Sequence, residues 1–121
     1  MPLKMRKNHS PEPPGPCDLT VCMDVISGQW AANVIWQLRG GPRRFSELKS
    51  DIPPISAKVL SKRLAELQEK GVISRHVKDT SPPSVEYALT ELGGELIPAI
   101  ESLVAVGLKL KNRQAQRSVE A

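Results

Sequence analysis

Residues 56–84 decide the fold, with SAKVLSKRLAELQEK at 56–70 followed by GVISRHVKDTSPPS at 71–84. Leu60, Leu64 and Leu67 recur at i, i+4 and i+7, the spacing that places side chains on one face of a helix. Ser56 suits the N-cap of this helix, and Gly71 suits its C-terminal stop. The segment therefore predicts an amphipathic helix over 56–70 with one buried face.

The face opposite these leucines is basic. At about 100° per residue, Lys58 and Lys62 lie nearly opposite the apolar stripe. Ala57 and Ser61 fall on one flank of that face, and Arg63 falls on the other. We interpret this face as a surface for a polyanion, the alternative being an ordinary solvated helix face.

Two segments after this helix have the composition of strands. Residues 72–78 and 85–89 carry β-branched and aromatic side chains. The intervening residues 79–84 are rich in turn formers. This pattern predicts a β-hairpin directly after the basic helix.

Three shorter helices are expected on the N-terminal side. One begins near Cys17 and stops at Ser27, the second contains Trp30 to Leu38, and the third surrounds Phe45 and Leu48 and is broken by the two prolines at 53 and 54. Cys22 lies on the apolar stripe of the first helix, and Trp30 shares a stripe with Val34, so both are predicted to pack in the core. An effector pocket lined by Trp30 and Trp36 is the alternative for the tryptophans.

A last helix is expected over residues 91–111, capped by Thr90. Its apolar face is too wide for one small domain to cover, which predicts a second subunit as the cover. The residues expected in this homodimer interface are Leu96, Ile97, Ile100, Leu103, Val104 and Leu108.

Charge is concentrated in one part of the chain. The 121 residues carry a net charge of +4, and segment 42–63, with six basic and two acidic residues, has a surplus equal to that whole value. Residues 1–16 are proline-rich and basic, so they are predicted to be a disordered arm, and residues 112–121 a flexible tail. The globular part is expected to span 17–111.

Composition and motifs exclude several classes of protein. No apolar run is long enough for a membrane span and no secretion signal is evident, so a cytoplasmic location is expected. Two cysteines five positions apart give neither a disulfide framework nor a metal site, and no cofactor is expected. Because no catalytic triad, HExxH motif or phosphate-binding glycine loop is present, the chain is not expected to be an enzyme.

The order of elements is that of a winged helix-turn-helix: a mainly α domain with a small β-hairpin, the helix-turn-helix at about 43–70 and the wing at about 72–89. A helix fits the major groove of duplex DNA, and a hairpin can reach the adjacent backbone. The predicted contacts to double-stranded DNA are Arg43, Arg44, Ser56, Ala57, Lys58, Ser61, Lys62, Arg63, Lys78 and Ser81. The competing interpretation is a dimeric protein-interaction adaptor with a vestigial helix-turn-helix.

Spaced blocks of the sequence resemble a known family. They are MDVISGQW at 23–30, GPRRFSEL at 41–48, GVI at 71–73, PPSVEY at 82–87 and LTELG at 89–93, with Cys17 upstream. Together they resemble the HxlR-type, MarR-like transcriptional regulators over about residues 17–108.

The resemblance implies a bacterial or archaeal regulator that is dimeric through its N- and C-terminal helices and binds inverted-repeat operators, and we expect this chain to act as a repressor. Some relatives sense electrophiles or oxidants through a cysteine at the place of Cys17, which implies a thiol-reactive or other small effector. The family pattern has proline after that cysteine and lysine before the tryptophan, where this chain has Asp18 and Gln29. A carboxylate beside the thiol disfavours the thiolate, whereas a helix N-terminus favours it.

Overall fold

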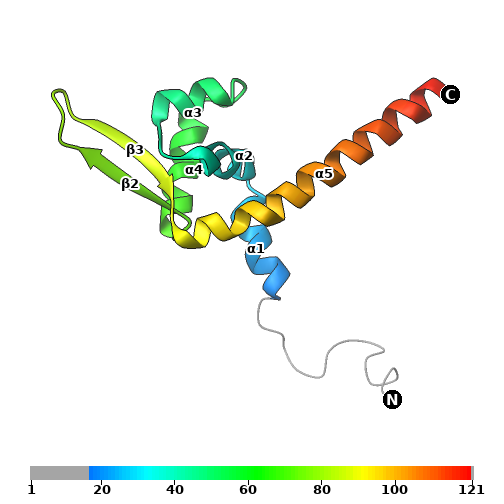
Figure 1. The fold of residues 1–121 in the computed structure, drawn as a ribbon, viewed down its shortest axis with the longest axis horizontal. Coiled ribbons are helices and arrows are strands. Elements are labelled where there is room, and N and C mark those ends of the chain that lie inside the picture. The colour runs from blue at the N-terminus through cyan, green and yellow to red at the C-terminus, as the bar shows by residue number, and fades with distance from the viewer. Residues whose placement is uncertain (1–16, 121) are drawn as a thin grey trace, which may run out of the picture.

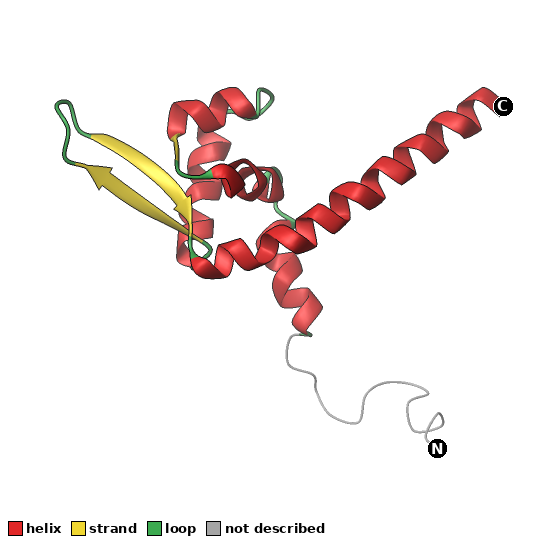
Figure 2. Ribbon diagram, viewed as in Figure 1, coloured by secondary structure: helices red, strands yellow, loops and turns green. Residues whose placement is uncertain are grey.

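The computed structural model describes residues 17–120, so the predicted N-terminal arm, residues 1–16, lies outside the described part. The elements in chain order are α1 Asp18–Ile26, α2 Ala31–Gln37, a 3-10 turn η2 Leu38–Gly40, β1 Arg43–Arg44, α3 Phe45–Asp51, α4 Ala57–Glu69, β2 Ile73–Lys78, β3 Ser84–Leu89 and α5 Glu91–Glu120. The mainly helical winged fold predicted from the sequence is confirmed (Figure 2).

The small sheet has three antiparallel strands in the order β1, β3, β2. The predicted hairpin is present, with Ile73 opposite Leu89 and Lys78 opposite Ser84. Strand β1 was not predicted, because two residues are too few to show alternation; it pairs Arg43 with Tyr87. Figure 1 shows the hairpin and the C-terminal half of α5 extending to opposite sides of the helical body.

Helix α4 supplies the centre of the core. Leu60, Leu64 and Leu67 are fully buried, as their spacing predicted, against Val34 and Ile35 of α2. The hydroxyl oxygen of Ser56 accepts a hydrogen bond from the Val59 amide at 3.1 Å, which confirms the predicted N-cap. The buried leucines therefore fix the rotation of α4 and leave its opposite face in solvent.

The junction between the sheet and α5 is unusually close. The Thr90 hydroxyl donates to the carbonyl of Gly71 at 2.7 Å and accepts from the amide of Gly93 at 3.1 Å, which confirms the predicted cap. The Thr90 amide also donates to the carbonyl of Val72 at 3.1 Å. A Cβ on Gly93 would lie 2.0 Å from that same carbonyl oxygen. Only glycine lets the first turn of α5 pack directly on the start of β2.

The predictions of a flexible C-terminal tail and of a buried Cys22 were both wrong. Helix α5 continues to Glu120, so residues 112–120 are helical and do not form the expected flexible tail. The reason is that residues 112–120 include several strong helix formers and contain neither Gly nor Pro. Cys22, expected in the core, is exposed, because α1 has no buried residue and packs only through the partly buried Val25 and Ile26.

We expect Gly93→Ala to lower the free energy of unfolding by about 1–3 kcal/mol, because the added methyl group must push the Val72 backbone away. The matched control is Gly94→Ala, since a Cβ there has no neighbour within 4 Å. This control should raise the free energy of unfolding by about 0.5–1 kcal/mol by reducing the entropy of the unfolded chain. Urea unfolding followed by circular dichroism measures both changes, and equal stabilities for the two variants would contradict the close packing at Gly93.

Candidate nucleic-acid interface

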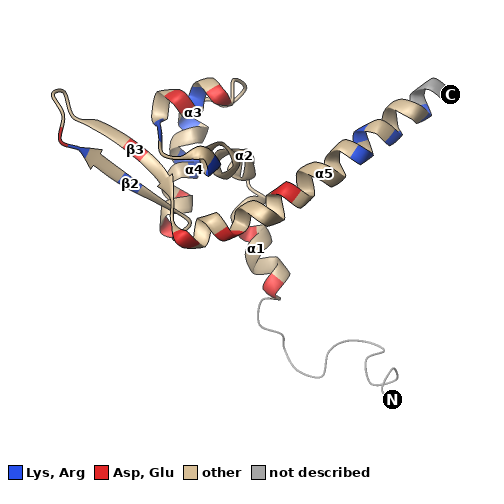
Figure 3. Cartoon of the chain, in the orientation of Figure 1, with Lys and Arg blue, Asp and Glu red and all other residues tan. Residues whose placement is uncertain are grey.

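The exposed face of α4 carries four of the predicted DNA contacts. Ala57, Lys58, Ser61 and Lys62 are all exposed, and neither lysine has an ion-pair partner among the described residues. Ser56 is exposed as well, but its hydroxyl oxygen caps the helix. Figure 3 shows basic residues on α4 and β1, both signs of charge on α3, and acidic residues in the first half of α5 followed by basic ones in its second half. A helix that presents this face can enter a major groove without exposing the core.

Strand β1 carries the two predicted arginines directly before α3 and pairs with β3 of the wing. Arg43 lies 3.7 Å from the carboxylate of Asp51 and 4.0 Å from that of Glu47. Arg44 is exposed and makes no ion pair with a described residue, and its backbone amide donates to Glu47 at 2.8 Å. Exposed ion pairs contribute only about 0–1 kcal/mol, so Arg43 can exchange its carboxylates for phosphate at little cost.

The hairpin carries the two predicted wing contacts. Lys78 ends β2 and lies 3.5 Å from the carboxylate of Glu86 on β3. Ser81 is exposed in the loop between the strands. Arg75, which the sequence analysis did not single out, is a further exposed cation on β2. The available signal was a basic residue within the segment expected to form the first strand of the wing.

Arg63 does not belong to the exposed face, so its assignment as a DNA contact is corrected. Its Nε donates to the carbonyl of Gln29 at 2.7 Å, and its guanidinium lies 2.9 Å from the carboxylate of Glu66. The side chain is only 15% exposed. A Cβ on Gly28 would lie 3.3 Å from the Arg63 Nε, so the glycine makes room for this contact. Arg63 holds α4 against the turn between α1 and α2.

The predicted dimer residues divide into two groups. Leu103, Val104 and Leu108 are more than half exposed, as an uncovered interface requires. Ile100 is buried within its own chain and is corrected to a core residue, because α5 packs against α2 at that point. Leu96 and Ile97 are partly buried against the same core.

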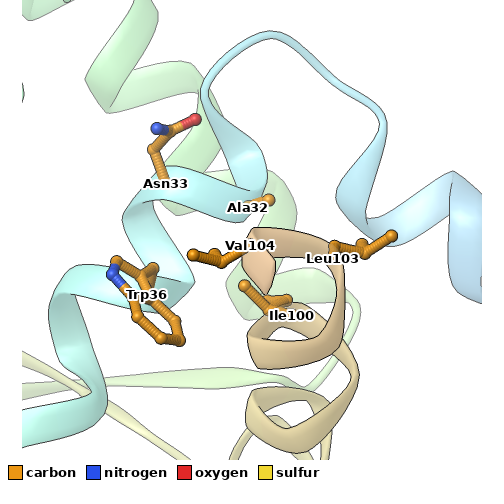
Figure 4. Close-up of a pocket in the computed structure, with 6 residues that line it drawn as sticks. All are labelled: Ala32, Asn33, Trp36, Ile100, Leu103 and Val104. Carbon is orange, nitrogen blue, oxygen red and sulfur yellow. The ribbon is translucent and has the colours of Figure 1, made fainter. Parts of the chain in front are cut away.

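An apolar cavity of about 230 Å³ lies between α2 and α5. Figure 4 shows Trp36 and Ala32 on one side of it and Ile100, Leu103 and Val104 on the other. Trp30 does not line this cavity and is partly buried against the core. The Trp36 ring also stacks on the Arg39 guanidinium, whose carbon lies 4.0 Å from the ring centroid, a contact that the sequence analysis missed.

Cys17 occupies the N-cap position of α1 and is exposed. The backbone amide of Thr20, followed by that of Leu19, lowers the pKa of the Cys17 thiol. Of the two opposing influences that the sequence presented, this direction of the Cys17 pKa is the one that a helix N-terminus produces. In the part of the chain that the structure describes, both cysteines are free and no cluster of side chains could hold a metal ion.

The fold and its basic face define a winged helix-turn-helix protein, a class that regulates transcription and is not enzymatic. The chain belongs to the HxlR-like helix-turn-helix family, whose pattern matches residues 25–115. Among residues 17–120, which the structure describes, no helix is both long and apolar enough to cross a membrane.

Named relatives agree with this assignment. The chain is 43% identical over 91 residues to YkvN, an HTH-type transcriptional regulator of Bacillus subtilis, covering 75% of this chain and 77% of YkvN. The crystal structure of the HTH-type transcriptional regulator ytcD superposes with a TM-score of 0.75 at 38% identity, covering 79% of this chain and 98% of that one. The redox regulator HypR in its oxidised form superposes with a TM-score of 0.73 at 33% identity. The match covers 77% of this chain and 96% of the HypR chain.

We expect Arg63→Ala to lower the free energy of unfolding by about 1.5–3 kcal/mol, because it removes the hydrogen bond from a charged donor to the Gln29 carbonyl and the packing of a largely buried side chain. Lys62→Ala, one residue away on the exposed face, should change it by no more than about 0.5 kcal/mol. Thermal and urea denaturation of both variants measure the difference. Unchanged stability together with weakened DNA binding for Arg63→Ala would instead make Arg63 a DNA ligand.

Proposed function

We propose that this protein is a cytoplasmic homodimeric repressor that binds an inverted-repeat operator in double-stranded DNA through α4. The observation that carries the proposal is the solvent-exposed face of Lys58, Ser61 and Lys62, set opposite three fully buried leucines. The core fixes the rotation of α4, so this face is presented to a ligand without rearrangement. An adaptor with a vestigial helix-turn-helix would leave this basic face without a role.

The DNA contacts divide by what each side chain can reach. In this arrangement Ser61 and Lys62 face the base edges, where a lysine donates to guanine acceptors. Arg43, Arg44, Lys78 and Ser81 flank the helix from β1 and the wing and contact phosphates. Phosphate contacts position the protein, whereas base contacts distinguish sequences. In a two-fold dimer the two copies of α4 enter successive major grooves, roughly 34–36 Å apart.

The test compares an operator, selected from a random duplex library with the purified protein, with a scrambled duplex of the same length. Lys62→Ala should lose about 1–3 kcal/mol of discrimination between the two duplexes. Arg44→Ala should weaken binding to both duplexes equally. It should also reduce the slope of log affinity against log salt concentration by about one per lost phosphate contact. For the unmodified dimer, six to ten phosphate contacts predict a loss of affinity of about 10³ to 10⁵ between about 50 and 200 mM salt.

Two outcomes would contradict this division. Equal loss on both duplexes for Lys62→Ala would make Lys62 a phosphate ligand, and no loss on either would mean that this face points to solvent. Operator affinity that is independent of salt would exclude phosphate neutralisation as the main source of binding.

A second function, regulation through the Cys17 thiol, is supported by a separate observation. The thiol is exposed at a helix N-terminus whose amides lower its pKa, and a low pKa favours the reactive thiolate. The structural relative HypR is a redox regulator. We propose that modification of Cys17 by an electrophile or oxidant changes operator affinity.

In a Cys22→Ser background, alkylation of Cys17 by iodoacetamide should reach half its maximal rate at a lower pH in the folded protein than in urea. The reason is that the Thr20 and Leu19 amides stabilise the thiolate only when α1 is formed. Rate profiles against pH with mass-spectrometric detection measure the shift, and coincident profiles would remove the basis for a reactive thiol. Operator binding after thiol modification, with Cys17→Ser as the control, then tests the regulatory role.

A further inference from the structure

The two faces of the small sheet carry different side chains. On one face, Ile73 is buried and Leu89 is partly buried against the core. Successive residues of a strand point to opposite faces, so Ser74, His76 and Lys78 of β2 lie on the other face. We call this second face, with the residues that pair with them on β3 and β1, the outer face of the sheet. Figure 1 shows the hairpin that bears it projecting from the helical body.

A row of polar side chains crosses this outer face. Glu86 on the central strand β3 is opposite Arg44 of β1 on one side and opposite His76 of β2 on the other. Directly opposite residues share a face, with their Cβ atoms about 4.5–5.5 Å apart. Lys78, two residues after His76, lies 3.5 Å from the Glu86 carboxylate. The carboxylate is therefore bordered by two permanent cations and by one side chain that becomes a cation on protonation.

Protonation of His76 doubles the positive charge of this face. Arg44 and Lys78 are cations and Glu86 is an anion, so the face has a net charge of +1 with a neutral ring and +2 with a protonated one. Histidine is the side chain that ordinarily changes its charge between about pH 5 and 8. His76 is exposed, so its ring is open both to protons and to a ligand.

The hydrogen bonds of the ring accommodate the charged form. The His76 Nε2 lies 2.7 Å from the Ser74 hydroxyl oxygen, and this hydroxyl donates to the carbonyl of Ala88 at 3.4 Å. A protonated ring donates through Nε2 to the Ser74 oxygen, while the hydroxyl keeps its hydrogen for Ala88. The second N–H of the charged ring, on Nδ1, is then available to an acceptor that approaches the sheet.

We propose that the outer face of the sheet binds the phosphate backbone of DNA and that protonated His76 is one of its phosphate ligands. The inference rests on the proposed function, which assigns Arg44 and Lys78 of the same face to phosphates. Because phosphate binds the charged ring better than the neutral one, operator affinity rises as the pH falls through the range in which histidine is protonated. Glu86 opposes binding, since it repels phosphate and holds Lys78 in an ion pair.

The test measures operator affinity at about pH 6 and pH 8, at constant ionic strength, by fluorescence anisotropy with the full-length protein. A Cys17→Ser background removes that thiol as a titrating group. Affinity should be about two- to fivefold higher per subunit at the lower pH, the effect of one exposed ion pair. His76→Gln should abolish this difference. The matched control is His9→Gln, which removes the other histidine of the chain and should retain the difference.

A comparison of duplexes identifies the kind of contact. Phosphate contacts carry no sequence information, so the lower pH should raise affinity for the operator and for the scrambled duplex by the same factor. Glu86→Gln should raise affinity for both duplexes at both pH values, because it removes the charge that repels phosphate. Thermal unfolding followed by circular dichroism verifies that each variant keeps its fold.

Four outcomes would overturn the proposal, each for a different reason. A pH dependence that disappears in His9→Gln but persists in His76→Gln would assign the titration to His9. An effect confined to the operator would make His76 a base contact. Unchanged affinity in both His76→Gln and Glu86→Gln would mean that the outer face points away from the DNA. A wild-type chain that binds neither duplex at either pH would refute the proposed function itself.

Discussion

The packing of Gly93 against the carbonyl of Val72 is the constraint on which the arrangement of the molecule depends. It brings the first turn of α5 onto the start of β2, where the Thr90 hydroxyl and amide bind the carbonyls of Gly71 and Val72. Since β2 follows directly from α4, the same contact sets the direction of α5 relative to the basic helix. The surface proposed for DNA and the surface proposed for a second subunit are thus held in one fixed arrangement.

Basic residues in this chain have two different roles that net charge alone does not separate. Lys58 and Lys62 remain in solvent and without ion pairs among the described residues, whereas Arg63 and Lys70 of the same region donate to backbone carbonyls at 2.7 Å. The difference follows from the rotation of α4. Residues opposite the leucines meet solvent, whereas Arg63 on one flank reaches the turn that precedes α2, and Lys70 at the C-cap of α4 reaches α1.

The sequence predicted the features that depend on local periodicity and capping. The leucine stripe, the Ser56 and Thr90 caps, and the hairpin were all recognisable because each depends on residues within one or two turns of chain. Strand β1 was missed because it exists only through pairing with Tyr87, far away in sequence. The environment of Arg63 depends on Gln29, and the burial of Ile100 depends on α2, so neither could be inferred from its own helix.

The attachment of α1 has a mechanical consequence. Because this helix buries no residue, little apolar packing holds it in place, and elements with few buried contacts open at low free energy. Two hydrogen bonds also attach the α1 region to α4. Arg63 of α4 donates to the carbonyl of Gln29, just after α1, and Lys70 at the C-cap of α4 donates to the carbonyl of Asp24 within α1. Detachment of α1 would release both bonds together, leaving Lys70 without its carbonyl acceptor and Arg63 with only its ion pair to Glu66 on α4. The thiol at the start of α1 therefore lies on an element whose undocking would change the positions of two cationic side chains on α4 and its C-cap.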